Sequence, residues 1–404
     1  MAIKQLSYKN SIVRALYFSG VLSCTELSGK IGKSYTLVVR TIEEMLQDGL
    51  VEERGYALSS GGRRSMTYGL PKDAIYSVGV AMDQFVTRIA ILDVNRMPVS
   101  GIHTFELLLQ DNPAAASLLA NAINEVVQGA VREKGIALSR IAGIGIGMPG
   151  FINTEIGTNY TFLGEGIREY LKQQTGLTVL IENDSTTIGL AEFKFGAVLN
   201  KRHALVVNLG WGIGLGMILD GKIFRGDSGF AGEFSHIPVF KNGKLCSCGK
   251  IGCLETEASL LFMIERAVME LEAGRASMLK LDILLQDDYE LKSSHFLQKA
   301  RAGDLLAIEI ISDVAYNIGR GISILVHLFN PSTVLLSGRC SVAGALWLPS
   351  IKRALNEYCI PRLLSNTTIE MSDLMHQAEL TGAAALVYEH LSDAAILKFL
   401  SPTG

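Results

Sequence analysis

Long apolar runs are missing from this sequence. No stretch reaches the roughly 18 apolar residues that a membrane-spanning helix needs, and the N-terminus lacks the apolar core of a signal peptide. Proline is also scarce, with 9 residues against 41 glycines, which favours tight turns over proline-rich linkers. We therefore expect a cytoplasmic protein with no membrane partner, whose cysteines stay reduced.

A strong net charge is missing as well. The formal charge is −3 over 404 residues, but residues 1–70 hold nine Lys/Arg against six Asp/Glu. This head is therefore basic and the rest of the chain acidic, which indicates nucleic acid as the partner of the N-terminal region. The length exceeds that of one ordinary domain, so we expect two or three domains.

Residues 1–70 have the pattern of a winged helix-turn-helix domain. Helical spacing over 6–18 predicts a first helix, Ser23 with Glu26 is typical of the start of a second, and Ser34 is typical of the start of a third. Residues 50–70 then predict two strands around a glycine-rich wing tip. We expect the third helix to enter the major groove and the tip to reach phosphates or the minor groove. The predicted DNA-binding residues are Ser34, Tyr35, Thr36, Arg40, Arg63 and Arg64. A helical interaction module is the alternative.

Residues 75–404 contain two similar series of strand and helix patterns. Apolar runs over 75–107 precede an amphipathic stretch at 113–134, and a second series of strands starts at 203. This pattern predicts two α/β lobes, 75–190 and 191–381, with a ligand cleft between them. Residues 260–310 are expected to be helical, and a C-terminal helix, 382–404, is expected to pack back on the first lobe.

Three of the six cysteines crowd into one segment. It contains His236, Cys246, Cys248 and Cys253, and one imidazole with three thiolates suits a tetrahedral zinc ion. A closed set of four protein ligands indicates structural Zn²⁺ rather than zinc that activates water. Three unrelated cysteines are the alternative.

This segment resembles the signature of the ROK family of repressors, open reading frames and kinases. Gly232, Glu233 and His236 match one element, with Ser235 where glycine is usual, and CSCGKIGCLE matches the cysteine element in full. GIGIGMPGFI, IENDSTTIGLAE, FNPSTVLLSG and TGAAALVYE match further family segments. Together with the winged head, the layout is similar to regulators of the NagC/Mlc/XylR type.

The resemblance implies both a fold and a sugar site. The body should be a two-lobed, sugar-kinase-like α/β domain of the actin/hexokinase, RNase H-like class. Carboxylates accept paired hydrogen bonds from vicinal hydroxyls, which fits the role of such residues in the family. In family kinases the residue that matches Asp184 is the catalytic base, and here we expect it to serve binding alone. By resemblance, the sugar is held by Asn183, Asp184, Glu233, His236 and Glu255.

Both phosphate loops of the family kinases are altered in this chain. The Asp-x-Gly-Gly-Thr loop corresponds to residues 81–85, where both glycines are replaced and Asp83 introduces an anion. The Gly-Thr-Gly-x-Gly loop corresponds to residues 210–214, where Trp211 replaces threonine. Lost glycines and a like charge both oppose ATP binding. The glycine run at 210–216 is read as a tight hairpin.

These features favour a regulator over an enzyme. We expect a repressor of carbohydrate genes that binds a double-stranded operator as a homodimer or homotetramer and responds to a sugar or sugar phosphate. Lobe closure on the sugar would move the two heads relative to each other through a connector near residues 70–72. An ATP-dependent, glucokinase-like sugar kinase and a zinc-stabilised scaffold are the alternatives, and a transporter protein is an alternative effector.

Overall fold

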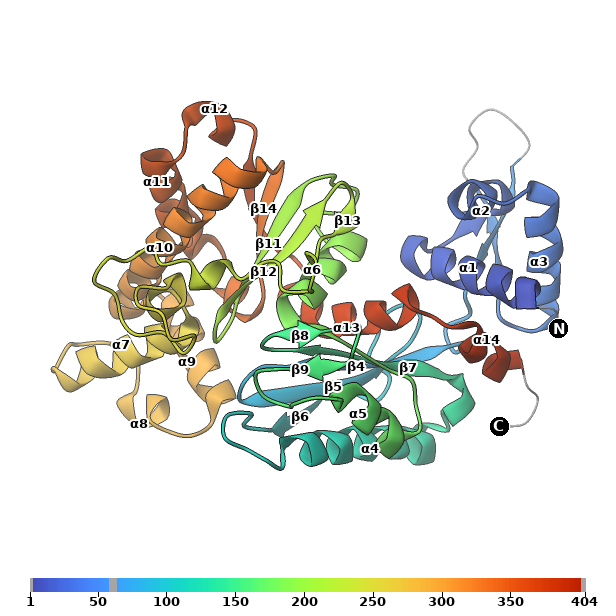
Figure 1. Cartoon of the computed structure of the whole chain (residues 1–404), viewed down its shortest axis with the longest axis horizontal. Helices are drawn as coiled ribbons and strands as arrows, with labels where there is room; N and C mark the ends of the chain where they lie inside the picture. Colours follow the sequence, from blue (N-terminus) through green and yellow to red (C-terminus); the bar gives the residue numbers. More distant parts are fainter. Residues whose placement is uncertain (1–2, 58–63, 401–404) are drawn as a thin grey trace.

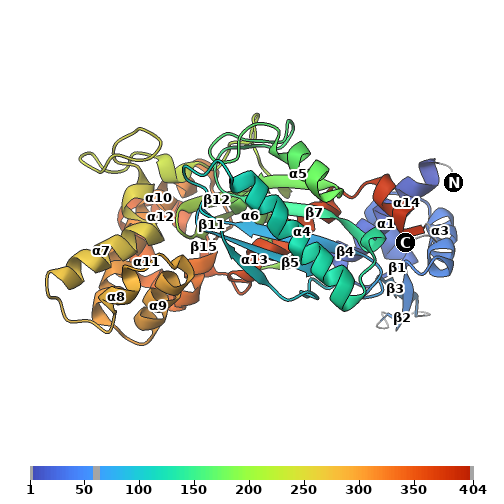
Figure 2. The same cartoon turned by 90° about the horizontal axis from the view of Figure 1, so that it is seen from below.

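A computed structural model describes residues 3–57 and 64–400. Figure 1 shows a head and two lobes that follow one another across the molecule. In both views the head lies at one end, and the helices α7 (Leu260–Glu272), α8 (Leu281–Leu284) and α9 (Tyr289–Arg301) lie at the other (Figures 1 and 2). Within the described ranges, no helix combines the length and the apolar character needed to cross a membrane.

The head is a winged helix-turn-helix, as predicted. Its helices are α1 (Ile3–Ser19), α2 (Cys24–Ile31) and α3 (Tyr35–Gln47), and its sheet has the order β1-β3-β2, formed by β1 (Leu22–Ser23), β2 (Glu52–Tyr56) and β3 (Met66–Gly69). Ser23 and Glu26 form the predicted capping box of α2, and the Ser34 hydroxyl accepts from the backbone N–H of Leu37 at the start of α3. The wing tip, with Arg63, lies outside the described residues.

The first lobe is built on a five-stranded sheet. Its order is β10-β7-β4-β5-β6, in which β7 and β10 run parallel to β4, and β5 and β6 form an antiparallel meander. One face is covered by α4 (Ala115–Lys134) and α5 (Ile167–Thr175), and a small hairpin is made by β8 (Ile152–Asn153) and β9 (Thr158–Asn159). The strands are β4 (Tyr76–Met82), β5 (Val86–Leu92), β6 (His103–Glu106), β7 (Ile141–Met148) and β10 (Val179–Asn183).

The second lobe repeats this topology. Its sheet order β13-β12-β11-β14-β15 places three antiparallel strands beside two parallel ones, as in the first lobe. The duplication predicted from the two strand series is therefore confirmed. The strands are β11 (Ala204–Leu209), β12 (Ile213–Leu219), β13 (Lys222–Ile223), β14 (Thr333–Ser337) and β15 (Thr368–Met371). The helices after α9 are α10 (Leu305–Phe329), α11 (Leu348–Tyr358) and α12 (Pro361–Leu364).

Two helices pack against each other between the sheets. α6 (Asp184–Phe195) contacts β11 and β12 of the second sheet, and α13 (Gln377–Glu389) contacts β4 and β7 of the first (Figure 1). Their backbones approach closely, because a Cβ atom on Gly382 would lie 2.1 Å from the carbonyl oxygen of Thr187. The expected boundary at residue 190 falls inside α6, because the helix continues through Gly189 to Phe195.

The C-terminal segment differs from the single helix expected over 382–404. It forms α13 and, after a break at 390–392, the separate helix α14 (Asp393–Leu400). The break has a local cause, because the Ser392 hydroxyl accepts from the N–H of Ala395 and starts a new helix. α13 packs on the first sheet, whereas α14 packs mainly on α1 of the head.

Candidate functional site

A cavity of about 410 Å³ lies between the two lobes. Its walls come from the ends of β4, β7, β10 and β11, the start of α6 and the loop that precedes the cysteine segment. The structure brings all five residues of the predicted sugar set onto this one wall: Asn183, Asp184, Glu233, His236 and Glu255. Loop ends at the carboxyl edge of a sheet are where α/β proteins commonly bind ligands.

The junction between β10 and α6 orients the first two of these residues. Asn183 caps the helix, since its Oδ1 accepts from the N–H groups of Ser185 and Thr186 at 3.0 and 3.2 Å. Its Nδ2 donates to the carbonyl oxygen of Gly150 at 3.2 Å, which ties the junction to the neighbouring loop. Asp184 then begins the helix, and its Oδ1 accepts from the N–H of Ser185 at 2.7 Å.

Three carboxyl groups of the cleft titrate at unusually high pH. Burial raises the pKa of Asp184 to about 6, and the negative charge of Asp83 adds to the effect. Burial also raises the pKa of Glu233 and that of Glu255 to about 7 each, with the charge of Asp184 contributing to both. The cleft therefore gathers hydrogen-bond acceptors that water solvates poorly, which suits hydroxyl donors.

The glycine run between β11 and β12 forms the predicted hairpin and shapes the wall beside Glu255. The N–H of Ile213 donates to Oε2 of Glu255 at 3.0 Å. A Cβ atom on Gly212 would lie 2.5 Å from Oε1 of Glu255, and one on Gly214 would lie 1.8 Å from the Ser185 hydroxyl. These glycines are thus needed for the close approach of polar side chains.

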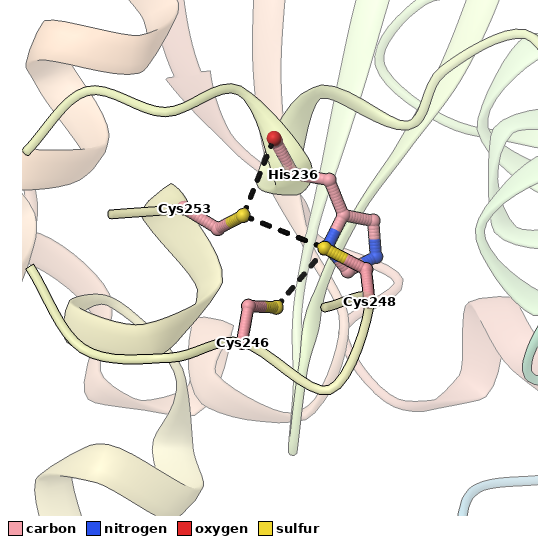
Figure 3. A group of neighbouring side chains, drawn as sticks. All are labelled: His236, Cys246, Cys248 and Cys253. Carbon is pink, nitrogen blue, oxygen red and sulfur yellow. Dashed lines mark hydrogen bonds between the residues drawn. The ribbon is translucent and has the colours of Figure 1, made fainter. Parts of the chain in front are cut away.

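The four predicted metal ligands meet in one cluster. The ligand atoms of His236, Cys246, Cys248 and Cys253 all lie within 4.8 Å of one another (Figure 3). Nδ1 of His236 lies 3.5 Å from Sγ of Cys246, and the Sγ atoms of Cys248 and Cys253 are 3.6 Å apart. Burial lowers the pKa of His236, which favours the neutral imidazole that metal ligation requires. The cluster could therefore hold a metal ion.

The imidazole of His236 links this cluster to the cleft. Its Nδ1 faces the thiols, whereas its Nε2 lies 3.8 Å from a carboxylate oxygen of Glu233. A metal on Nδ1 would fix the ring plane and leave Nε2 for a ligand in the cleft.

Aromatic rings fill the region of the two altered phosphate loops. Phe85, from the turn after β4, stacks on Tyr289 of α9 with ring centroids 3.6 Å apart and meets Trp211 edge-on at 5.1 Å. Trp211 is only 5% exposed and also packs edge-on against Tyr289. The sequence predicted the two loop changes, but Tyr289 was missed because no local pattern marks its contact with Phe85.

Arg339 also lines the cleft and was missed by the sequence analysis. Its Nη2 donates to Oδ2 of Asp83 at 2.9 Å, and its Nη1 donates to Oε2 of Glu290 at 2.6 Å. These bonds join the two lobes, since Asp83 belongs to the first and Arg339 to the second. A charged residue just after the buried strand β14 was the signal that could have found it.

The described residues of the predicted DNA-binding set lie on one part of the head. Ser34, Tyr35, Thr36 and Arg40 are exposed on the first turns of α3, and Arg64 is exposed beside the wing. Tyr35 is 56% exposed, so its ring is accessible on this part of the head. Nε of Arg40 lies 3.4 Å from Oε1 of Glu44, one turn further along the same helix face.

Comparisons with known proteins extend over most of the chain. A sequence model described as the ROK family matches residues 103–390. The xylose repressor of Caldicellulosiruptor bescii is 29% identical over 394 residues, covering 95% of this chain and 96% of the repressor. The glucokinase of Halalkalibacterium halodurans is 32% identical over 275 residues, covering 67% of this chain and 82% of the glucokinase.

One solved structure has the same fold over its whole length. It is a ROK family transcriptional regulator described as a homolog of the E. coli MLC protein. The two structures agree with a TM-score of 0.76 at 24% sequence identity, covering 98% of this chain and 99% of the other. The head and the two lobes thus occur together in another protein.

Proposed function

Since the chain belongs to the ROK family, we propose that it is a DNA-binding transcriptional regulator, a repressor of carbohydrate genes, and not an enzyme. The observation that carries this proposal is that all five residues predicted to hold a sugar line one cleft, while aromatic rings fill the region of the altered phosphate loops. The similarity to the xylose repressor spans 95% of the chain, including the head, whereas the glucokinase match covers 67%.

The cleft would bind its sugar through paired hydrogen bonds. Asp184, Glu233 and Glu255 offer carboxylate oxygens to hydroxyl groups, and Asn183 and His236 add an amide and an imidazole nitrogen. Burial of these groups makes each unpaired acceptor unfavourable, so a ligand that satisfies them gains affinity and specificity.

The cysteine cluster would hold a structural zinc ion. Three thiolates and one imidazole form a closed donor set, and the spacing of these atoms fits tetrahedral ligation. Zinc would supply cross-linking of the loop that carries Glu233 and Glu255. His236 would then orient Nε2 toward the sugar, while the three cysteines serve the fold.

The head would bind operator DNA through α3 and the wing. Ser34, Tyr35, Thr36 and Arg40 would face the major groove, and Arg63 and Arg64 would contact the backbone or minor groove. A two-half-site operator requires two heads, so a homodimer is the minimal assembly.

The sugar signal would reach the head along α6. This helix has 12 residues, about 18 Å of length, with Asp184 at its first turn and Phe195 at its last. Phe195 stacks on Phe18 of α1 at 5.9 Å and meets Tyr17 edge-on at 5.8 Å. Lobe closure that moves α6 along α13 would therefore shift α1, by a route separate from the connector at residues 70–72.

A sugar kinase is the second candidate, because Asp184 has the position and raised pKa of a general base. The aromatic cluster opposes it. ATP-dependent phosphorylation that disappears in Asp184→Asn would support the kinase and contradict the regulator as stated.

A DNA-binding titration tests the proposal. Labelled fragments from upstream of the gene and its neighbours are mixed with purified protein, with and without a panel of sugars. We expect one fragment to bind specifically and one sugar to change its affinity at least about fivefold. Arg40→Ala should weaken binding of that fragment, whereas the matched change Arg202→Ala, an exposed arginine in the second lobe, should not. Absence of specific binding to every fragment would contradict the proposal.

A further inference from the structure

We propose that the effector is an uncharged, unphosphorylated sugar and that Asp83 acts as a built-in anion that excludes sugar phosphates. This inference rests on the sugar-responsive function proposed above and narrows it to one chemical class. It is carried by the charges that line the cleft and by the hydrogen-bond donors near Asp83.

Carboxyl groups outnumber basic side chains on the described wall of the cleft. Its ionisable groups in the described part of the chain include five carboxyls and a single guanidinium, that of Arg339. No lysine of the described ranges lines this cavity. The carboxyls belong to Asp83, Asp184, Glu233, Glu255 and Glu379. A phosphate group, which carries nearly two negative charges at neutral pH, would be repelled by the carboxylate of Asp83 and would otherwise meet carboxyl groups, which do not attract an anion in either protonation state.

Arg339, the one guanidinium among the described residues of the wall, is already ion-paired. Arg339 is only 10% exposed and is paired with Asp83 and Glu290, and its Nη1 also donates to the Ser293 hydroxyl at 3.3 Å. A phosphate could bind Arg339 only if the guanidinium gave up its ion pairs, which would leave the carboxylates of Asp83 and Glu290 unpaired and poorly solvated. Breaking a buried ion pair in this way is strongly unfavourable.

Asp83 itself occupies the anion position of the altered first loop. Its Oδ1 accepts from the N–H groups of Phe85 and Val86, both at 2.8 Å, and its Oδ2 accepts from Arg339. Two backbone N–H groups and a guanidinium are the donors that a phosphate would need. The side chain therefore takes the place of an external anion.

Three further backbone donors of the cleft are also occupied. The N–H groups of Ser185 and Thr186 in the first turn of α6 donate to Asn183, and the N–H of Ile213 donates to Glu255. A helix N-terminus with free N–H groups would attract an anion, but this one is capped by its own side chain. Hydroxyl groups need no such donors, because they can donate to the carboxylates themselves.

The test compares neutral sugars with their monophosphates in the full-length protein without DNA. Isothermal titration calorimetry is run with a panel of aldopentoses, aldohexoses and N-acetylhexosamines and the monophosphate of each. We expect the sugar that binds to exceed its own monophosphate in affinity by at least about 100-fold at neutral pH. Trp211 on the cleft wall provides an independent fluorescence signal for the same titration.

The variant Asp83→Asn tests the role of the built-in anion. It keeps an oxygen acceptor for the two N–H groups but removes the charge, so the ratio of the two affinities should fall about tenfold. Asp220→Asn is the matched control, because Asp220 is exposed on the β12–β13 turn, outside the cleft, and its loss should leave the ratio unchanged. If Asp83→Asn does not fold, the ratio of sugar affinity to sugar-phosphate affinity in the wild-type protein still tests the inference.

The outcomes separate this inference from the proposed function. A sugar phosphate that binds as tightly as its parent sugar, or more tightly, would overturn the inference and leave the sugar-responsive regulator intact. An unchanged ratio in Asp83→Asn would overturn the role of Asp83. Absence of binding by every member of the panel would overturn both proposals.

Discussion

At the scale of single residues, Asp184 is a carboxyl group that is both shielded from water and charged at neutral pH. It lies half-buried in the cleft, and burial raises its pKa from 3.8 to about 6. At neutral pH the folded protein therefore holds a carboxylate that water would solvate better in the unfolded chain. The site is prepared for hydroxyl donors at the expense of stability, which is common in binding clefts.

Asp184→Asn should stabilise the protein while removing its response to sugar. Because the folded-state pKa is raised, the contribution of this group to stability is highest below pH 3.8 and is lost as the pH rises through about 6. Asparagine removes this loss, so we expect a gain in the free energy of unfolding of about 3 kcal/mol at pH 8 and about a third of that at pH 4.5.

Urea unfolding at the two pH values, with calorimetric titration of the sugar, measures both effects. Asp220→Asn, an exposed carboxylate outside the cleft, is the control and should change neither quantity appreciably. A destabilised Asp184→Asn protein at pH 8, or one that still binds sugar normally, would contradict this assignment.

The metal cluster yields a second prediction. Purified protein should contain one zinc ion per chain, and Cys246→Ser should lose it and unfold about 5–10 °C lower. Sugar affinity should also fall, because His236 would lose its fixed orientation beside Glu233. Cys359→Ser, a thiol outside the cluster, should keep the zinc. Atomic emission measures the zinc content, and thermal unfolding measures the stability. A wild-type protein that contains no zinc, and whose unfolding temperature does not change when zinc is added, would refute the zinc site.

Residue-level prediction from sequence worked where the partners are close along the chain. His236 and the three cysteines fall within 18 residues, so their spacing alone identified the cluster. Arg339 and Asp83 are 256 positions apart, and nothing in either segment marks the other as its partner. Contacts of this kind depend on how the lobes pack, which residue patterns do not encode locally.

At the scale of elements, α6 joins the cleft to the head. Its last turn contributes Phe195, which also packs under the guanidinium of Arg96 at 4.2 Å, and Lys194, whose ammonium lies 4.8 Å from the ring centroid of Phe18. Beside it, Tyr17 stacks on Tyr388 of α13 at 3.5 Å. The head is thus docked on the two helices that would move if the lobes close.

Phe195→Ala should uncouple the two sites without destroying either. The ring lies far from the cleft and from the exposed face of α3, so sugar and DNA affinities should each stay within about threefold of wild type. The effect of sugar on DNA affinity should fall toward none, because the contact with α1 is lost.

Fluorescence anisotropy of labelled operator, with and without saturating sugar, measures this coupling. Phe224→Ala, which removes an exposed ring just after β13, should retain the full sugar effect. Wild-type coupling in Phe195→Ala would mean that another route, such as residues 70–72, transmits the signal.

Prediction of the elements from sequence was accurate where a local signal starts or ends a helix. Ser23, Glu26 and Ser34 mark the starts of α2 and α3, because capping involves residues within three positions. Ser392 offered the same kind of signal for α14, but the apolar pattern around it continues and concealed the break. The predicted boundary at 190 lies inside α6, a helix that contacts both the second sheet and α13.

At the scale of the whole molecule, the fold was predictable because it is duplicated. Two series of strands with equivalent order signal two equivalent lobes, and the strand orders of the two sheets agree. The docking of α14 and α1 was not predictable, since it joins the ends of the chain. It makes the head continuous with a core that includes Tyr388 and Ile396.

The central claim is that one molecule couples a sugar cleft to a DNA-binding head. Coupling between two binding sites is reciprocal, so sugar must change the dissociation constant of the operator by the factor by which operator changes that of the sugar. The most direct measurement is therefore the operator Kd at zero and saturating sugar, by fluorescence anisotropy, paired with the sugar Kd at zero and saturating operator, by calorimetry. We predict two equal factors of at least about five. A protein that binds both ligands, with both factors equal to one, would contradict the account.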